Sequence, residues 1–257
     1  MECFVRGPDS RIPPAPDLVR ARFNSQYSGE IMFLFRKIAM IAMLALLSAC
    51  ATSVKMQPSQ DQPEVADVSK KVTLLVTVML RNDNNPGYQP QAFVVMTERP
   101  DGKGGVESIN FPMDAIGNVV TKEKTDAQLR LVLDPQPHVL RLIWATSGTF
   151  PIRGNFHVPL HMDVKITEPG VYYGGHIQAV VRPRVGEEFK AGPTVPLLDQ
   201  GVVGASGGSF DVEVQDRYDT DIAAMREKFP ALRQVQIKKA LLPAWDRAKA
   251  QKWWAEH

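Results

Sequence analysis

Two histidines, His157 and His161, lie four residues apart in a segment of alternating polarity. On a helix this spacing would bring two imidazoles to one metal ion, but alternation with period two predicts a strand. On a strand the two rings lie about 13 Å apart, too far for one ion whose ligand bonds are about 2.1 Å. We therefore expect exposed histidines on a polar strand face. His138 and His176 have no obvious carboxylate partner in the sequence and receive no role.

A serine flanked by glycines, Ser206, is the second candidate for chemistry, in the run from Gly204 to Gly208. The run matches G-x-S-x-G, in which a sharp turn between a strand and a helix exposes a serine hydroxyl beside its base. Here a Gly- and Pro-rich loop precedes the serine and a strand follows it. We expect a flexible glycine loop and assign no catalytic residue.

An acidic stretch is the third candidate, because carboxylate oxygens bind hard cations. A calcium loop would need alternating carboxylates, a glycine and a terminal Glu, and this stretch lacks that spacing. We expect a solvated strand face followed by negative charges at a helix N-terminus. Without spatial separations, no pair of carboxylates is assigned as acid and base. The stretch contains Asp211, Glu213, Asp216, Asp219 and Asp221.

Two further segments are candidates for contacts rather than for chemistry. The loop from Arg182 to Gly208 holds six Gly and three Pro; loops of this length are uncommon and are often binding elements, although an additional hairpin is the alternative. Near the C-terminus, three tryptophans among basic residues would suit a helix at a membrane surface. We favour packing of these rings on the sheet, because Asp246 and Glu256 leave the segment only slightly positive. The tryptophans are Trp245, Trp253 and Trp254.

Strands must position most of these residues. Period-two alternation predicts a strand from Phe156 to Ile166, with Pro159 placing it at an edge or a bulge. The turn Glu168-Pro169-Gly170 then leads to a strand from Val171 to Val181, so we expect a β-hairpin. Further strands are predicted at residues 73–80, 92–98, 128–134, 138–146 and 209–216.

The order of the elements predicts a mainly β fold. Several short strands separated by turns favour an antiparallel β-sandwich or a barrel-like domain. A parallel α/β fold would need interleaved helices, and the pattern contains none before residue 219. Two helices are predicted near the C-terminus, from Asp221 to Phe229 and from Ala244 to about Ala255.

An export signal precedes the predicted domain. Ten apolar residues, Ile38 to Leu47, follow Arg36 and Lys37, and this layout is typical of a secretory signal. As a helix the run covers about 15 Å, half of a hydrocarbon core of about 30 Å, so it is too short to span a membrane. The residues Leu47-Ser48-Ala49-Cys50 that follow resemble the lipobox of bacterial lipoproteins.

This resemblance implies cleavage between Ala49 and Cys50, a diacylglyceryl group on the Cys50 thiol and acylation of the new amino end. Several acyl chains anchor a protein stably, whereas one does not. In the family, Asp at the next position marks retention in the inner membrane, so Ala51 favours the outer membrane. Residues 169–175 and the helix after the acidic strand are also broadly similar to bacterial envelope lipoproteins. An ordinary signal peptide with a chance cysteine and a buried apolar helix remain alternatives.

The sequence divides into four segments. Residues 1–31 show no strand or helix period and are expected to be an upstream extension or a cytoplasmic tail, because Met32 gives a signal peptide of normal length, 32–49. Residues 50–71 are expected to be the lipidated cysteine and a flexible tether, since they are polar and hold no aromatic residue. Residues 72–257 are predicted to form one domain.

Charge and cysteine content narrow the function. The net charge is +2, and residues 50–257 carry 24 basic and 24 acidic residues, a balance that argues against a nucleic-acid partner. Cys3 and Cys50 are the only cysteines, so processing would leave no free thiol for catalysis or a disulfide. No cofactor or metal is predicted.

These features predict a membrane-anchored, non-catalytic interaction or structural module on the periplasmic face of the cell envelope. Its expected partners are the membrane, through acyl chains on Cys50, and an envelope protein. A periplasmic hydrolase on the same anchor and a carrier of a small or lipidic ligand are the alternatives. An enzyme would gather titratable groups in a cleft, a scaffold would expose an apolar or aromatic patch, and a carrier would enclose a cavity.

Overall fold

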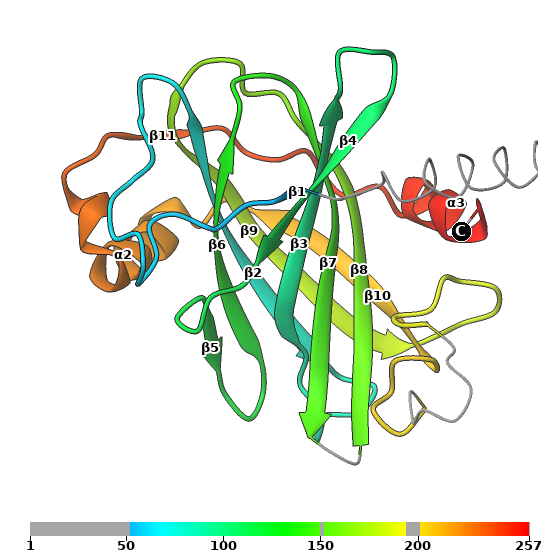
Figure 1. The fold of residues 1–257 in the computed structure, drawn as a ribbon. Coiled ribbons are helices and arrows are strands. Elements are labelled where there is room, and N and C mark those ends of the chain that lie inside the picture. The colour runs from blue at the N-terminus through cyan, green and yellow to red at the C-terminus, as the bar shows by residue number, and fades with distance from the viewer. Residues whose placement is uncertain (1–51, 150–151, 194–200, 257) are drawn as a thin grey trace, which may run out of the picture. The chain divides into compact units, whose positions relative to one another are not determined.

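A computed structural model describes residues 52–149, 152–193 and 201–256. The predicted signal segment, the cleavage position at Ala49 and the lipidation site Cys50 lie outside these residues. Two β-sheets form the described fold, which Figure 1 shows from the side of the first sheet. The chain is therefore mainly β, with two sheets and two short C-terminal helices and no closed barrel among the described strands.

Sheet A has five strands and sheet B has six. In spatial order, sheet A contains β1 (Thr52–Ser53), β4 (Val106–Pro112), β3 (Gln91–Pro100), β7 (His138–Thr149) and β8 (Ile152–Val164). Sheet B contains β10 (Gly208–Gln215), β9 (Gly170–Pro183), β2 (Val72–Asn82), β6 (Thr125–Leu133) and β5 (Asn118–Val120), and β11 (Ile237–Lys239) pairs with β9.

The central pair of sheet B is parallel, which corrects the expectation of a wholly antiparallel sandwich. β2 runs beside β9, with Val72 opposite Gly170 and Asn82 opposite Val181. A parallel pair needs a long crossover connection. The crossover here is not a helix but the intervening chain, which forms β3, β4, β7 and β8 of sheet A and the β5–β6 edge of sheet B.

The predicted hairpin between residues 156–166 and 171–181 is wrong. Both segments are strands, but β8 pairs with β7 in sheet A and β9 pairs with β2 and β10 in sheet B. The turn around Pro169 therefore carries the chain from one sheet to the other. A turn signal fixes a change of direction and does not fix which strands form hydrogen bonds.

Alternating apolar residues of both sheets fill the space between them. Val76 and Leu129 of sheet B and Ile143 and Phe156 of sheet A have no solvent-exposed surface, and all belong to one buried cluster. Each such side chain contributes about 1.5–3 kcal/mol by leaving water. This core holds the two sheets together and leaves each with an outer face.

The helices lie at opposite sides of the sandwich (Figure 1). α2 (Tyr218–Lys228) packs on the outer side of sheet B, where Ile222 and Met225 join Leu75 and Tyr173 in a second buried cluster. α2 ends before Phe229, because Pro230 disfavours helical conformation in the residue before it. η2 (Pro230–Arg233) follows. α3 (Arg247–Glu256) lies beside β8.

The segment expected to be a flexible tether is held on the sandwich at its first described residues. Thr52 and Ser53 form β1 beside β4, and Met56 is only 2% exposed within the core. The Gln57 amide donates to the Arg130 carbonyl at 3.2 Å. Polar composition favoured a tether, but a single buried methionine and backbone pairing are enough to fix this part of the chain.

Candidate functional site

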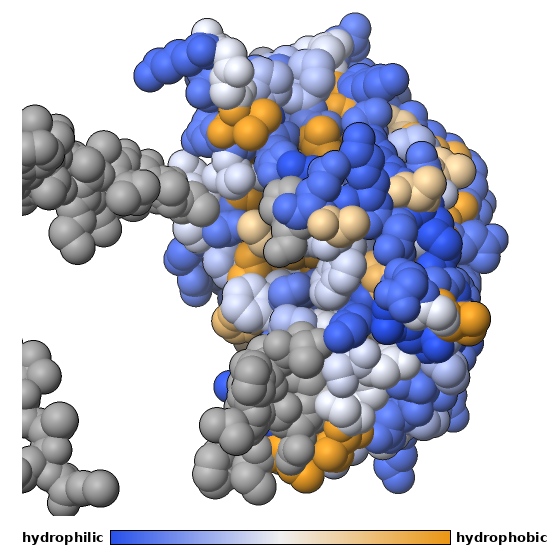
Figure 2. Space-filling model, turned by 90° about the vertical axis from the view of Figure 1, so that its right-hand side faces the viewer, coloured by the Kyte–Doolittle hydropathy of each residue, from blue (hydrophilic) through white to orange (hydrophobic). Residues whose placement is uncertain are grey.

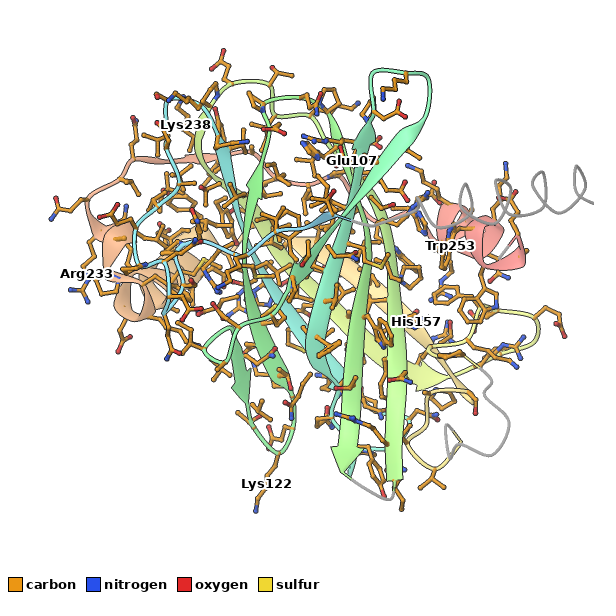
Figure 3. All side chains as sticks on the ribbon, in the orientation of Figure 1. Glu107, Lys122, His157, Arg233, Lys238 and Trp253 are labelled. Carbon is orange, nitrogen blue, oxygen red and sulfur yellow. The ribbon has the colours of Figure 1, made fainter. Side chains whose placement is uncertain are left out.

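An aromatic cluster lies on the outer face of sheet A. Phe93 of β3 is 55% exposed and Trp144 of β7 is 37% exposed, and their ring centroids lie 6.1 Å apart, edge to face. His157 of β8 contacts the other side of Trp144, with centroids 5.8 Å apart. Burial lowers the pKa of His157, so its ring is neutral near pH 7. We call these three residues the aromatic cluster; Figure 3 labels His157.

Strand register explains why these rings meet. On β7, Trp144 is opposite Val94 of β3 on one side and His157 of β8 on the other. The side chains of Val94, Trp144 and His157 therefore point to the same face of sheet A. The register shifts between Ala92 and Val94, and such a bulge redirects a side chain that regular alternation would place otherwise. The bulge turns Phe93 outward beside Trp144.

Apolar residues extend this surface toward the β3–β4 connection. Val106 is 67% exposed and lines a hollow of about 300 Å³, whose apolar lining residues include Pro100, Pro137 and Val139. Val139 pairs with Glu98 and Asp163, which are outward-facing residues of the neighbouring strands. We call the aromatic cluster together with this hollow the aromatic face.

A buried polar cluster lies on the opposite sheet, between β9 and α2. Both carboxylate oxygens of Asp221 lie 3.1 Å from His176 Nδ1, and the Tyr173 hydroxyl donates to Asp221 Oδ2 at 2.7 Å. Arg217 Nη1 lies 3.3 Å from His176 Nε2. His176 and Asp221 are 3% and 5% exposed, so this histidine has the carboxylate partner that spacing along the sequence did not indicate.

A glycine bulge brings these groups together. Tyr173 and His176 are three residues apart, so a regular strand would point them to opposite faces. The pairing of β9 with β2 shifts by one residue at Gly174, and Gly175 adopts φ +121°, which is readily available only to glycine. Both side chains therefore point out of sheet B toward α2.

The protonation of this cluster follows from its partners. Arginine only donates hydrogen bonds, so we assign Nε2 of His176 as the acceptor and Nδ1–H as the donor to Asp221. Burial and Asp221 raise the pKa of Tyr173, which keeps its hydroxyl protonated. A carboxylate that orients an imidazole in this way is also found behind catalytic bases. In this cluster Arg217 donates to His176 Nε2, the nitrogen that would have to accept a proton if His176 acted as a base.

Ser206 lies far from this histidine. Gly208, two residues after the serine, pairs with Pro183 at the end of β9, whereas Gln215 pairs with His176 at the middle of β9. These two positions lie about 23 Å apart along the strand. A strand, β10, follows the serine instead of a helix. The serine therefore has neither the turn nor the base that the motif requires.

The other two histidines among the described residues are buried, which corrects the expectation that His161 is exposed. Its φ of +48° accompanies a register shift in β8, so it is 4% exposed and its Nδ1 lies 2.9 Å from Arg141 Nη1. His138 is 3% exposed, and burial together with Arg99 lowers its pKa to about 4.

The acidic stretch is partly solvated and partly paired with cations, and Asp219 and Asp221 lie in the first turn of α2, as expected. Asp211 accepts from Arg182 at 2.9 Å and also pairs with Arg247. Asp216 pairs with Lys239 at 2.8 Å. Glu213 faces solvent. Asp221 is the exception in burial, as described above.

The loop at residues 182–208 and the tryptophans pack against each other, in the parts that the structure describes. Phe189 is fully buried with Trp245 and Trp254 at 6.2 and 6.5 Å, and Trp245 Nε1 donates to the Pro159 carbonyl at 2.8 Å. The rings thus cover the edge strand β8 rather than an open sheet face. This side of the molecule is mostly hydrophilic with separate apolar patches (Figure 2).

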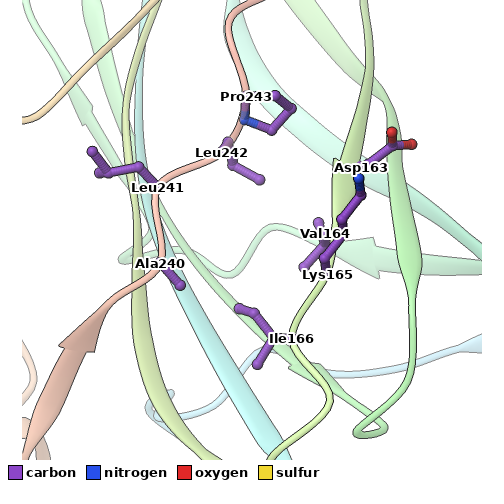
Figure 4. A pocket seen from close by; sticks show the side chains of 8 residues that line it. All are labelled: Asp163, Val164, Lys165, Ile166, Ala240, Leu241, Leu242 and Pro243. Carbon is purple, nitrogen blue, oxygen red and sulfur yellow. The ribbon is translucent and has the colours of Figure 1, made fainter.

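A second hollow, of about 280 Å³, lies between the end of β8 and the chain after β11. In Figure 4, Val164 and Ile166 lie across from Ala240 and Leu242. Leu242 is buried and its amide donates to the Gly174 carbonyl at 2.8 Å. Because its floor belongs to the core, we treat this hollow as part of the packing at the open end of the sandwich.

The described part of the chain has no helix long and apolar enough to cross a membrane. Within the same residues, no group of three His, Cys, Asp or Glu side chains is arranged to hold a metal ion. No family model, curated protein or solved structure matches the chain. The site is therefore interpreted from its own geometry.

Sequence reasoning missed the aromatic face. Trp144 was detectable in principle, because it falls between the inward-facing Ile143 and Ala145 of a predicted strand. The outward position of Phe93 depends on a bulge, which the residue pattern does not reveal.

Proposed function

We propose that this protein is a lipid-anchored envelope protein that acts as a non-catalytic interaction or structural module in the periplasm. The anchor is Cys50, by resemblance to the lipobox, with the outer membrane favoured. The contact surface is the aromatic face of sheet A. The observation that carries the proposal is the exposed edge-to-face pair of Phe93 and Trp144 on an otherwise ordered sheet.

Exposed aromatic rings favour a contact surface on physical grounds. Large apolar patches on a soluble domain mark interaction sites, whereas single exposed apolar residues are normal. Phe93, Trp144 and Val106 are three of the large exposed apolar residues of the described chain, and all three belong to sheet A. Tryptophan and other aromatic residues are also enriched at interfaces.

The alternative functions have less support. A hydrolase would use His176 as a base, but Arg217 contacts its Nε2, and Ser206 lies near Pro183 at the end of β9, away from His176 at its middle. A carrier would hold its ligand between the sheets, and packed side chains such as Val76, Leu129 and Phe156 occupy that space. The polar cluster is better explained as the attachment of α2 to sheet B.

The contact surface is tested by photo-cross-linking in intact cell envelopes. A photoreactive phenylalanine analogue replaces Phe93 in one variant and Val119 in the other; Val119 is 44% exposed on β5 of sheet B. We expect adducts at position 93, with protein or lipid, and few at position 119. Equal yields at both positions would contradict the proposal.

The anchor is tested separately by the intact mass of the protein extracted from membranes with detergent. The expected mass is that of residues 50–257 plus acyl chains, and Cys50→Ser should abolish the acylated form. A mass that retains the leader, or an unacylated soluble product, would remove the anchor.

A further inference from the structure

Thr52, the first residue that the structure describes, follows the proposed acylation site by two residues. Thr52 pairs with Ile109 in β1, and its Oγ1 donates to Glu107 Oε1 at 3.0 Å. Two residues of fully extended chain span at most about 7 Å. Cys50 therefore stays within that distance of Thr52 whatever its conformation, and the acyl chains would leave the sandwich little freedom to move away from the bilayer.

The start of the fold is fixed by more than β1. The Val54 amide donates to the Asn110 carbonyl at 2.8 Å, and Met56 is buried in the core. Releasing β1 to create a tether would expose Met56, which costs about 1.5–3 kcal/mol. The short link between anchor and sandwich is therefore maintained by packing.

We propose that the aromatic face of sheet A lies against the lipid bilayer that holds the acyl chains of Cys50. This inference rests on the proposed function, because it needs the anchor. It names the lipid surface as the partner of the aromatic face. The outer face of sheet B and α2 then point away from the membrane and into the periplasm.

Two surfaces meet at β1, and their chemistry distinguishes them. The outer edge beside β1 is polar: Thr52 and Ser53 are exposed, and Lys55 forms an exposed ion pair with Asp61. The adjoining face carries the exposed side chains of Phe93 and Val106. Aromatic and apolar side chains are stabilised at the boundary between headgroups and acyl chains, so the face is the surface that gains by contact with lipid.

The geometry places the rings within reach of the same bilayer surface. β4 and β3 follow β1 in sheet A, so β3 lies about 10 Å from β1 and β7 about 15 Å. Thr52 aligns with Thr97 through Ile109, so Phe93 lies four residues, or about 13 Å, further along the sheet. A face of this size lies flat on a membrane to which one edge is fixed.

Charge does not drive this contact. Residues 50–257 carry equal numbers of basic and acidic residues, and Glu98 beside the hollow pairs with Arg141 at 2.7 Å. Attraction to anionic lipid needs clustered basic residues. We therefore expect apolar contact that changes little between low and high salt.

The experiment uses the processed acylated protein, residues 50–257, which lacks Cys3, in vesicles of phosphatidylethanolamine and phosphatidylglycerol. Spin labels are attached to Phe93→Cys and Val106→Cys on the aromatic face, and to Val119→Cys and Glu213→Cys on sheet B as matched exposed controls. Acylation blocks the thiol of Cys50, so each variant carries one label. Collision rates with oxygen, which partitions into lipid, and with a water-soluble nickel chelate report the depth of each label.

We expect a several-fold higher ratio of oxygen to nickel accessibility at positions 93 and 106 than at 119 and 213. Aqueous values at all four positions, in protein that a carbonate wash leaves on the vesicles, would overturn the inference while the anchor stands. Protein that the wash removes would overturn the anchor and the inference together. In native envelopes, labels at 93 and 106 shielded from both reagents would indicate a protein partner instead of lipid and would also overturn it.

Discussion

The two outer faces of the sandwich differ in their most prominent groups, which are buried charges on sheet B and exposed aromatic rings on sheet A. On sheet B, Arg130 and His176 are buried beneath the N-terminal segment and α2, and His176 pairs with Asp221 of α2. On sheet A, Phe93 and Trp144 are left exposed. Burying charged side chains and exposing aromatic rings are each the reverse of what solvation alone would favour.

Arg130 shows how completely sheet B is covered. Its side chain has no exposed surface, pairs with Asp114, and donates from Nε to the Pro58 carbonyl at 2.6 Å. Its guanidinium also lies 4.1 Å from the centroid of the Phe229 ring. Residues far apart in the chain thus cover Arg130 on this part of sheet B.

The largest expected effect comes from breaking the buried ion pair of sheet B. Asp114→Ala leaves the Arg130 charge buried without its partner, and such a loss costs about 3–5 kcal/mol of unfolding free energy. Urea unfolding followed by circular dichroism measures it. Asp126→Ala is the control, because its pair with Lys124 is partly exposed and should be worth less than about 1 kcal/mol. Equal losses of unfolding free energy in the two variants would show that burial does not make the Arg130–Asp114 pair more important than the Lys124–Asp126 pair.

Acid should weaken the inner side of sheet A through His138. Its pKa of about 4 in the folded protein lies below the unfolded value of about 6.5, so the unfolded state binds more protons between these values. The stabilisation is complete above pH 6.5 and falls as pH falls toward 4, by at most about 3 kcal/mol. In urea unfolding, His138→Gln should flatten the slope of the unfolding free energy against pH between pH 6.5 and 5. An unchanged slope would mean that other groups cause the pH dependence.

A smaller loss is expected when the polar cluster of sheet B loses its charge. Asp221→Asn keeps the volume but weakens the hydrogen bonds to Tyr173 and His176, at a cost of about 1.5–3 kcal/mol for bonds to a charged group. Hydrogen exchange should show faster opening of α2 than of β3 or β7. Uniform acceleration across both sheets would mean that the cluster does not act locally.

The smallest effect on stability is expected on the aromatic face. Removing the ring in Phe93→Ala breaks one edge-to-face pair, worth about 0.5–1.5 kcal/mol beyond buried area. The double variant with Trp144→Ala should remain folded, yet lose most of the lipid contact reported by a label at Val106→Cys. Retained lipid contact at position 106 would show that the anchor alone sets the orientation.

Much of the fold is predictable from the residue pattern, because alternation is a local property. The strands at residues 73–80, 92–98, 128–134, 138–146 and 209–216 all correspond to observed strands, and both C-terminal helices are present. The partners of strands are not local, so the parallel β2–β9 pair and the separation of β8 from β9 were not foreseen. The short β1, β5 and β11 and the strand β4 also escaped prediction.

Side-chain positions that depend on irregular backbone escaped prediction too. A bulge turns Phe93 outward, another brings Tyr173 and His176 to one face, and the backbone of His161 has φ +48°. Each irregularity inserts one residue into a strand, so regular alternation no longer predicts which face the side chains beyond it point to. The lipidation of Cys50 and the envelope location remain predictions from the sequence.

The parallel pair at the centre of sheet B also determines when the protein can fold. β2 begins at Val72 and its partner β9 ends at Pro183, so the middle of this sheet cannot assemble until the chain between them is available. Strand pairs this distant in sequence slow folding, because closing the long loop costs entropy before the strands gain any stabilising contacts. The strands that precede β9 must therefore wait for residues up to Pro183 before the centre of sheet B can form.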